Sequence, residues 1–373
     1  MKKFLFWTVL ASVALTGCVK NDAEPNLSLG QDVEITFNQP VVGKITKATD
    51  TNHYGEISNA TYPTTEQFIV HAWAHEGNFD PDASPAHMVY INQEKVEHFD
   101  GQGLTGPDGD TGTYGTWRIN PTYYWPKTHK LTFTAYSPNQ IKTYASIDVK
   151  KGIELKDVVI GSDVKNHIDI LYSNRVYNQT YPEYKYDIDN DELIGVDIQF
   201  HHALASVKVM VKAKENYTSI DKDQITIHRI WFDNVEMQGT FSEGLSTGKE
   251  PSSTGSWKDL TATSEVDLNG IAGDVVIDGF YDDAKKYGST ALLIPQALDG
   301  NLNVNYTITN PDGVFIEETK TFILANQTSG STLINEWEQS KRYTYTLIFG
   351  LNEIYLAPQV DDWTPVTMSD INI

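Results

Sequence analysis

Apolar and polar residues alternate in short segments along most of this chain. In residues 33–37 every second side chain is apolar, which is the period of a half-buried β-strand. The same alternation, rich in β-branched and aromatic residues, recurs in seven further segments: 68–73, 131–136, 205–211, 225–232, 291–294, 302–308 and 343–349. Gly, Pro, Asn and Asp separate the segments. The pattern predicts an all-β protein made of antiparallel sandwiches or barrels.

Helical periodicity is scarce. Only residues 282–287 and 333–339 have a pattern that would fit short helices. The Gly-rich stretches 101–115 and 239–256 are predicted to be surface loops. No repeat of fixed period is visible, which argues against solenoids and propellers.

The length of the chain predicts two domains, because about 350 residues exceed the size at which a single core stops growing. The best boundary lies in residues 181–196, where Pro182 and an acidic run at 187–192 separate two strand-rich halves. We therefore expect an N-terminal domain over residues 31–190 and a C-terminal domain over residues 191–373.

The N-terminus predicts export. Met1-Lys2-Lys3 is followed by an apolar run at residues 4–13 and then by Leu15-Thr16-Gly17-Cys18, which is the order of a secretory signal peptide. The run is shorter than the roughly 20 residues that span a bilayer. Residues 15–18 resemble the bacterial lipobox, which implies that residues 1–17 are removed and that Cys18 is acylated. The alternative is an ordinary signal peptide followed by an unpaired thiol.

The balance of charge bears on the partners. The 373 residues have a formal net charge of −22, and losing Lys2 and Lys3 with the signal peptide changes it to −24. Such a charge repels nucleic acid and anionic lipid headgroups. The predicted attachment to a bilayer is therefore the lipid on Cys18, with residues 18–30 as a flexible tether. A single cysteine also excludes an internal disulfide.

Candidate chemistry is sparse. The common metalloprotease, phosphate-loop and serine hydrolase motifs are missing, so we expect no enzyme and no cofactor. His71 and His75 would lie on one face of a strand and could share a metal, but surface or edge positions are the preferred interpretation. His201 and His202 are adjacent, so a strand would point them to opposite faces, as packing and capping residues.

Two other patterns have weaker functional interpretations. Asp187, Asp189 and Asp191 alternate as in the first half of a calcium loop, but the Gly and bidentate Glu of the second half are missing, which favours a solvated connector. A hydrolase with paired carboxylates in this run is the enzyme alternative. The aromatic residues include Trp117 and residues 123–125, and exposed rings would provide a platform for sugars.

Several segments together resemble the fimbrillin family of Bacteroidales-type bacteria, the Mfa-like lipoproteins that build pili. They follow in order along nearly the whole chain: the lipobox, Ile35-Thr36-Phe37, Trp117-Arg118, Tyr124-Trp125-Pro126, residues 131–136, residues 169–172, residues 200–205, Leu293-Ile294-Pro295-Gln296, residues 343–347 and Asp362-Trp363. The resemblance implies two antiparallel β-sandwich domains of transthyretin-like type in tandem. It also implies polymerisation by donor-strand exchange after a protease removes the first strand.

The resemblance gives the first strand a role. Val33, Ile35 and Phe37 share one face and would form the displaceable strand, with residues 33–42 completing the first domain; the alternative is a permanent first strand. Family members cut by an arginine-specific protease carry Arg after this strand. Here Lys47 stands in that place, and the first arginine is Arg118. Maturation is therefore expected at Lys44 or Lys47, elsewhere, or not at all.

The sequence thus predicts a fimbrillin-like lipoprotein of the outer membrane surface and fimbrium, acting as anchor, tip or accessory subunit. Its expected partners are other fimbrillin subunits, the bilayer through Cys18, and a host or bacterial surface ligand, with no nucleic acid. The main alternative is a glycan-binding lipoprotein of the outer surface. A flat platform of exposed aromatic rings would favour that alternative.

Overall fold

The computed structural model describes residues 29–43, 61–99, 102–105, 111–113, 116–180, 186–187, 192–193, 195–214, 224–243, 255–268, 274–277, 285–313, 315–350 and 354–363. This part of the chain is nearly all β, as the alternation predicts. Its helical elements are two short 3-10 turns, η1 (Asn139–Thr143) and η2 (Val164–Asn166). Within these ranges no helix has the length and apolar character needed to cross a membrane.

The first region is a nine-stranded sheet in the order β2-β8-β5-β4-β10-β13-β17-β3, with β14 also paired to β10. Its strands are β2 (Thr36–Phe37), β3 (Val41–Val42), β4 (Phe68–His75), β5 (Met88–Phe99), β8 (Thr116–Asn120), β10 (Lys130–Ser137), β13 (Leu171–Ser173), β14 (Val176–Gln179) and β17 (Gln199–His202). Short pairs accompany it: β1 (Leu29–Glu34) with β9 (Tyr124–Pro126), β6 (Gln102–Thr105) with β7 (Thr111–Thr113), and β15 (Tyr186–Asp187) with β16 (Glu192–Leu193).

The second region is a sandwich of two sheets. The larger contains β11 (Ala145–Asp148), β12 (Gly152–Val159), β19 (Gln224–Ser242), β20 (Ser256–Asp267), β21 (Val275–Ile277), β24 (Asn301–Thr309) and β25 (Phe315–Ile323). The smaller has the order β22 (Lys285–Leu293), β18 (Ala205–Ala213), β29 (Lys341–Phe349) and β30 (Ile354–Asp362). Two short pairs flank them: β23 (Gln296–Ala297) with β28 (Glu336–Trp337), and β26 (Gln327–Ser329) with β27 (Thr332–Ile334).

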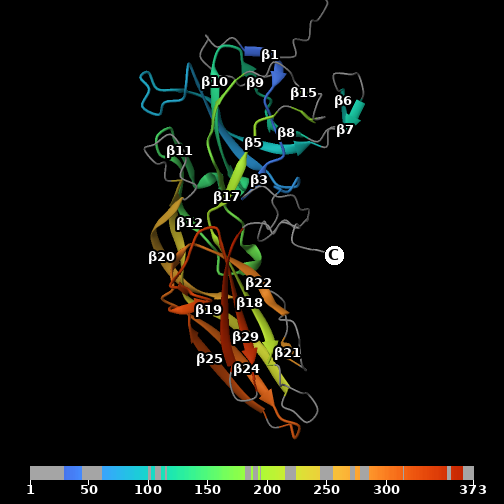
Figure 1. Cartoon of the computed structure of the whole chain (residues 1–373), viewed down its shortest axis with the longest axis vertical. Coiled ribbons are helices and arrows are strands. Elements are labelled where there is room, and N and C mark those ends of the chain that lie inside the picture. Colours follow the sequence, from blue (N-terminus) through green and yellow to red (C-terminus); the bar gives the residue numbers. More distant parts are fainter. Residues whose placement is uncertain are drawn as a thin grey trace, which may run out of the picture.

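Each region has its own apolar core. The first core contains Phe37, Phe68 and Phe133. The second contains side chains of both sheets of the sandwich, with Phe232 of β19 against Tyr345 of β29, and it extends to Ile69, Tyr136 and Tyr172 on the first sheet. The two regions follow one another along the long axis of the molecule (Figure 1).

The strands do not divide between the regions at residue 190. Strands β11 and β12 precede that position, yet β12 pairs with β19 of the second region. Strand β17 follows it and pairs with β13 of the first sheet. A boundary at 190/191 is therefore not the place where the strands change sheet. Alternation shows that a strand has a buried face, but not which core buries it.

Two expectations about local structure are wrong. The segments near 282–287 and 333–339 do not form helices where they are described, because β22 begins at Lys285, β27 occupies residues 332–334 and β28 occupies residues 336–337. The predicted loops at 101–115 and 239–256 also contain strands: β6 pairs with β7 in the first, and in the second β19 continues to Ser242 and β20 begins at Ser256. In both cases pairing with a neighbouring strand overrides a weak local signal.

Candidate functional site

Residues 33–43, near the start of the described chain, form the N-terminal segment. Its alternation places Ile35 and Phe37 in the first core with 0% and 2% of their surface exposed, while Val33 packs against that core from a half-buried position. Phe37 packs edge-to-face on Phe68 and Phe133, with ring centroids 5.6 and 5.9 Å away. These are the side chains that the period of the sequence assigned to one face.

The backbone of the segment joins two edges of the first sheet. Strand β2 pairs antiparallel with β8, and β3, four residues later, pairs parallel with β17 at the other end of the strand order. Between them the Asn38 N–H donates to the Val196 carbonyl (3.1 Å), and the Val196 N–H donates to the Thr36 carbonyl (2.9 Å). The segment therefore closes the sheet on itself, and Figure 1 shows β3 beside β17 in the upper part of the molecule.

Polar side chains hold the segment where it crosses between the edges. The Asn38 amide donates to Asp197 Oδ1 (2.7 Å), and its Oδ1 accepts from the Gly195 N–H (3.0 Å). A Cβ on Gly195 would lie 2.6 Å from Asn38 N and from Phe37 C, so the close approach requires glycine. The Gln199 amide donates to the Gly43 carbonyl (2.9 Å) at the far end.

Tyr62 covers the same segment from the other side. Its N–H donates to the Pro40 carbonyl (2.9 Å), and the Gln39 amide donates to the Tyr62 carbonyl (2.8 Å). The ring is fully buried against Trp117 and Phe200, and burial raises the pKa of its hydroxyl. The contact makes Tyr62 part of the packing around the segment.

This arrangement defines a strand-shaped site. Without residues 33–43, the backbone groups of β8 and of residues 196–200 that bond the segment would lose their partners beside an apolar groove. Burying side chains such as Ile35, Phe37 and Val42 contributes about 1.5 to 3 kcal/mol each. An extended segment with alternating apolar residues would fit the groove because it supplies both the ladder and the side chains.

Other residues singled out in the sequence lie outside the described part of the chain. They are the lipidation candidate Cys18, the cleavage candidates Lys44 and Lys47, the acidic residues Asp189 and Asp191, and the tail at 364–373. Val33, Ile35 and Phe37 are brought together at the strand-shaped site, as described above.

His71 and His75 were expected at surface or edge positions, and this expectation is wrong. Strand β4 is an inner strand between β5 and β10, and both side chains are 3% exposed. His71 packs on Trp73 with ring centroids 4.6 Å apart, and His75 Nε2 lies 2.9 Å from Thr132 Oγ1. Burial lowers the pKa of each imidazole to about 4. Across the described residues, no group of three or more His, Cys, Asp or Glu is placed to hold a metal.

His201 and His202 point to opposite faces, as expected. His201 is half-buried and bonds Asn174 Oδ1 (2.9 Å). His202 is buried: its Nδ1 lies 3.0 Å from the carboxylate of Asp169, and its ring stacks on Trp363 at 3.6 Å. The stacking of Trp363 on His202 links the end of β30 to the first sheet. No local sequence signal could have indicated this long-range contact.

The aromatic residues do not form the platform that a sugar site would need. Trp117, Tyr123 and Trp125 are buried in the first core, and only Tyr124 of that group is exposed. The other exposed aromatic residues among those described, Phe99, Tyr144 and Tyr355, lie on separate elements. The glycan-binding alternative therefore lacks its expected surface in this part of the chain.

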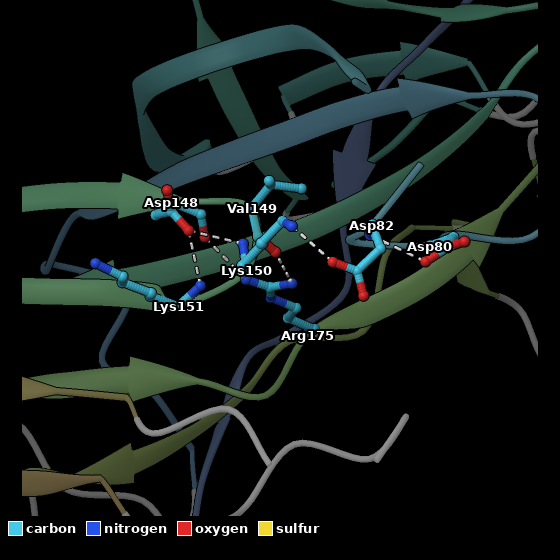
Figure 2. Close-up of polar contacts among 7 residues, drawn as sticks. All are labelled: Asp80, Asp82, Asp148, Val149, Lys150, Lys151 and Arg175. Atoms are coloured by element: carbon cyan, nitrogen blue, oxygen red, sulfur yellow. Dashed lines mark hydrogen bonds and ion pairs between the residues drawn. The ribbon is translucent and has the colours of Figure 1, made fainter. Parts of the chain in front are cut away.

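A polar clamp joins the two regions (Figure 2). Arg175, between β13 and β14, donates to the carbonyls of Val149 (2.7 Å) and Asp148 (3.1 Å) in the turn between β11 and β12. The Asp148 carboxylate accepts the N–H groups of Lys150 and Lys151, and Lys150 Nζ bonds Asp82 at 2.6 Å. The contacts hold the β11–β12 hairpin against the first sheet, although the hairpin belongs to the larger sheet of the second region.

The fold and the site define a class: an all-β protein whose N-terminal segment completes a sheet from both edges. The sequence profile of the fimbrillin-like family matches residues 46–363, which is most of the chain. The chain therefore belongs to the fimbrillin-like family. None of the curated proteins matches it.

Solved structures resemble the chain at low sequence identity. A fimbrial protein of Bacteroides vulgatus is 17% identical with a TM-score of 0.51, covering 88% of this chain and 99% of that one. A candidate cell adhesion protein of Bacteroides uniformis is 16% identical with a TM-score of 0.48, covering 90% and 99%. The tip fimbrial protein Mfa3 of Porphyromonas gingivalis is 9% identical with a TM-score of 0.36, covering 80% and 94%. The first of these shares the fold.

Proposed function

We propose that this protein is a non-enzymatic, structural or adhesive subunit of a pilus, assembled by donor-strand exchange, with residues 33–43 as the strand that is exchanged. The observation that carries the proposal is the closure of the first sheet. The segment bonds β8 on one side and residues 196–200 on the other, and it buries Ile35, Phe37 and Val42. Membership of the fimbrillin-like family supports the same function.

The proposal includes a lipid anchor at the outer membrane. Acylation of Cys18 would hold the chain at a bilayer. The tether expected at residues 18–30 is shortened to 18–28 in this proposal, because Leu29 and Gly30 already lie in β1, which pairs with β9. The partners are other fimbrillin subunits and a ligand on a host or bacterial surface. The proposed protein has two domains. Strands β11 and β12 belong to the second domain, because β11 pairs with β12 and β12 pairs with β19 of its larger sheet.

The subunit is better suited to an anchor, tip or accessory position than to a self-polymerising stalk. No arginine precedes Arg118, so arginine-specific maturation cannot occur near the N-terminus, and Lys44 and Lys47 are the nearby candidates. In the tail at 366–373, apolar residues alternate as far as Met368, but Ile371 and Ile373 then fall on the opposite face. A break of this kind weakens a donor strand, because a one-residue slip reverses the buried face.

A peptide complementation experiment tests strand exchange. All residues up to and including Lys47 are removed, so that the truncated chain begins at Ala48. A synthetic peptide of residues 33–43 is then added. The control peptide carries Ile35→Lys and Phe37→Lys. We expect the truncated chain to melt at lower temperature than the full chain and to regain stability with the native peptide alone, because only that peptide refills the apolar groove.

Light scattering and electron microscopy of the truncated chain separate the two parts of the proposal. Donor-strand exchange would be refuted if the truncated chain stays monomeric, melts at the same temperature as the full chain, and binds neither the peptide nor the C-terminal tails of other fimbrillin subunits. Long homopolymers would refute the accessory position and leave strand exchange standing.

The anchor has its own test. Cys18→Ala removes the thiol that a diacylglyceryl group requires, so the protein should leave the membrane fraction and lose incorporation of a clickable fatty acid. Each buried methylene contributes about 0.8 kcal/mol, so loss of the chains should release nearly all of the protein. Fatty-acid labelling that persists in the variant would contradict the anchor at this residue.

A further inference from the structure

Strand β25 forms an open edge of the second sandwich. In the described part of the chain it pairs with β24 and with no other strand. Every side chain from residue 316 to residue 321 is exposed, and Ile316 and Ile323 show 57% and 64% of their surface to solvent. Figure 1 shows β25 at the margin of the lower part of the molecule, beside β24.

The edge formed by β30, in contrast to that of β25, is protected against pairing with another strand. Pro358 interrupts its row of N–H donors, and its Val360 N–H donates to Ser329 Oγ of β26 (3.2 Å). Proline and covering contacts are the usual protection of an edge strand. Strand β25 contains no proline. It is therefore the edge better able to accept another strand.

The free backbone groups of β25 follow from its ladder. The Leu324 N–H donates to the Gly300 carbonyl, and bonded and non-bonded pairs alternate in an antiparallel ladder. The odd-numbered residues of β25 therefore turn their backbone groups away from β24. The Gln327 amide, which reaches the Ile323 carbonyl at 2.7 Å, agrees with this direction. Thr319, at the centre of the strand, is one of these residues.

The sequence of β25 is complementary to itself in the antiparallel direction. When Thr319 is set opposite Thr319 of another copy, Glu318 faces Lys320 and Lys320 faces Glu318. Ile316 then faces Phe322, once on each side of the centre. Opposite charges and apolar pairs directly across a ladder are stabilising. This register places outward-turned backbone groups opposite one another.

We propose that β25 binds β25 of a second copy of this chain as an antiparallel extension of the larger sheet, about a two-fold axis midway between the Thr319 residues of the two copies. Such an interface is isologous, so it closes at two copies. It joins subunits side by side, and it is distinct from the strand exchange proposed for residues 33–43. One strand pair buries less than the roughly 1,200 to 2,000 Å² typical of stable complexes, so the dimer is weak and depends on concentration.

Charge exchange tests the pairing. The chain from residue 18, with Cys18→Ser to remove lipid and thiol, is studied by sedimentation velocity at about 0.15 M salt, where distant charges are screened. We expect a reversible dimer for the parent. Glu318→Lys and Lys320→Glu each place like charges at both pairs, and each should weaken the dimer about tenfold or more. Thr319→Pro, which removes the central outward N–H, should abolish it.

The decisive sample is an equimolar mixture of the two charge variants. Positions 318 and 320 are then both lysine in one copy and both glutamate in the other, so each charged pair of a heterodimer again joins opposite charges. The heterodimer should form about as tightly as the parent dimer. Glu317→Lys is the matched control, because Glu317 faces the uncharged Thr321, and it should leave the dimer unchanged. Thermal unfolding confirms that each variant is folded.

Any of three results would overturn the proposal. One is a parent chain that stays monomeric at its highest soluble concentration. Another is a dimer of unchanged affinity in both charge variants and in Thr319→Pro, which would place the contact elsewhere. Variants that dissociate while their mixture stays monomeric would likewise exclude this register.

Discussion

The N-terminal segment closes the first sheet, whereas strand β29 lies inside the smaller sheet of the second region, and the two are held in different ways. Strand β2 has two register pairs with β8, and β3 has two with β17. Strand β29 has eight pairs with β18 and nine with β30. Phe37 and Phe349 are both buried in their cores. The segment is thus held by short ladders and separate backbone hydrogen bonds together with buried side chains and side-chain clamps, whereas β29 is held by two long backbone ladders.

The difference bears on which element can leave the native structure. Each ladder bond contributes roughly 0.5 to 1.5 kcal/mol, so a long ladder opens only with its whole region. A short ladder at the start of the chain can open alone. The first sheet would then lose its closing segment while its inner strands, such as β4 and β10, keep their pairing.

The comparison predicts different responses to the loss of one phenyl ring. Phe37→Ala should destabilise the first region by about 3 to 5 kcal/mol, because it leaves a cavity between Phe68 and Phe133. Hydrogen exchange should then quicken mainly at residues 196–200. Phe349→Ala, the matched variant, should cost a similar amount and quicken exchange across β18 and β30. Equal exchange patterns in the two variants would contradict the distinction.

Acid should loosen the first region through its buried histidines. Burial, with a smaller contribution from Arg175, lowers the pKa of His71 from 6.5 to about 4. As pH falls, the unfolded chain therefore binds a proton at this histidine before the folded chain does. The contribution of neutral His71 to the free energy of unfolding is fully present above pH 6.5 and is lost as pH falls towards 4. A shift of that size corresponds to at most about 3 kcal/mol. His71→Leu should reduce the pH dependence of the free energy of unfolding between these values, while the part due to His75 remains. An unchanged slope would count against this role of His71.

The smallest expected effect is at the close approach of Gly195 to the segment. Gly195→Ala puts a Cβ against backbone atoms of Asn38 and Phe37, which should cost about 1 to 3 kcal/mol. Gly161→Ala is the matched control, since nothing lies within 4 Å of its added Cβ, and it should stay within about 0.5 kcal/mol. Denaturant unfolding measures both. Similar losses in the two variants would mean that the approach is not tight.

Much of the secondary structure was predictable because strand alternation is a local property. The segments at 68–73, 131–136, 205–211 and 343–349 all lie in strands. The helices expected near 282–287 and 333–339 failed because windows of six or seven residues do not separate helical from strand periods. The histidines of β4 were misplaced because their polarity suggests solvent, while β4 is buried on both faces.

The sequence by itself determined the all-β class, the family, the acidic charge and the face of residues 33–37 that is buried, since each depends on composition, order or local period. Only the tertiary structure decided that residues 36–43 connect β8 with β17, that Arg175 holds the β11–β12 turn, and that β25 remains an open edge. Such contacts join residues as far apart in the chain as Asn38 and Asp197, which are separated by 159 positions. A local pattern specifies what a strand will bury, but the partner is chosen by packing and register across the whole chain.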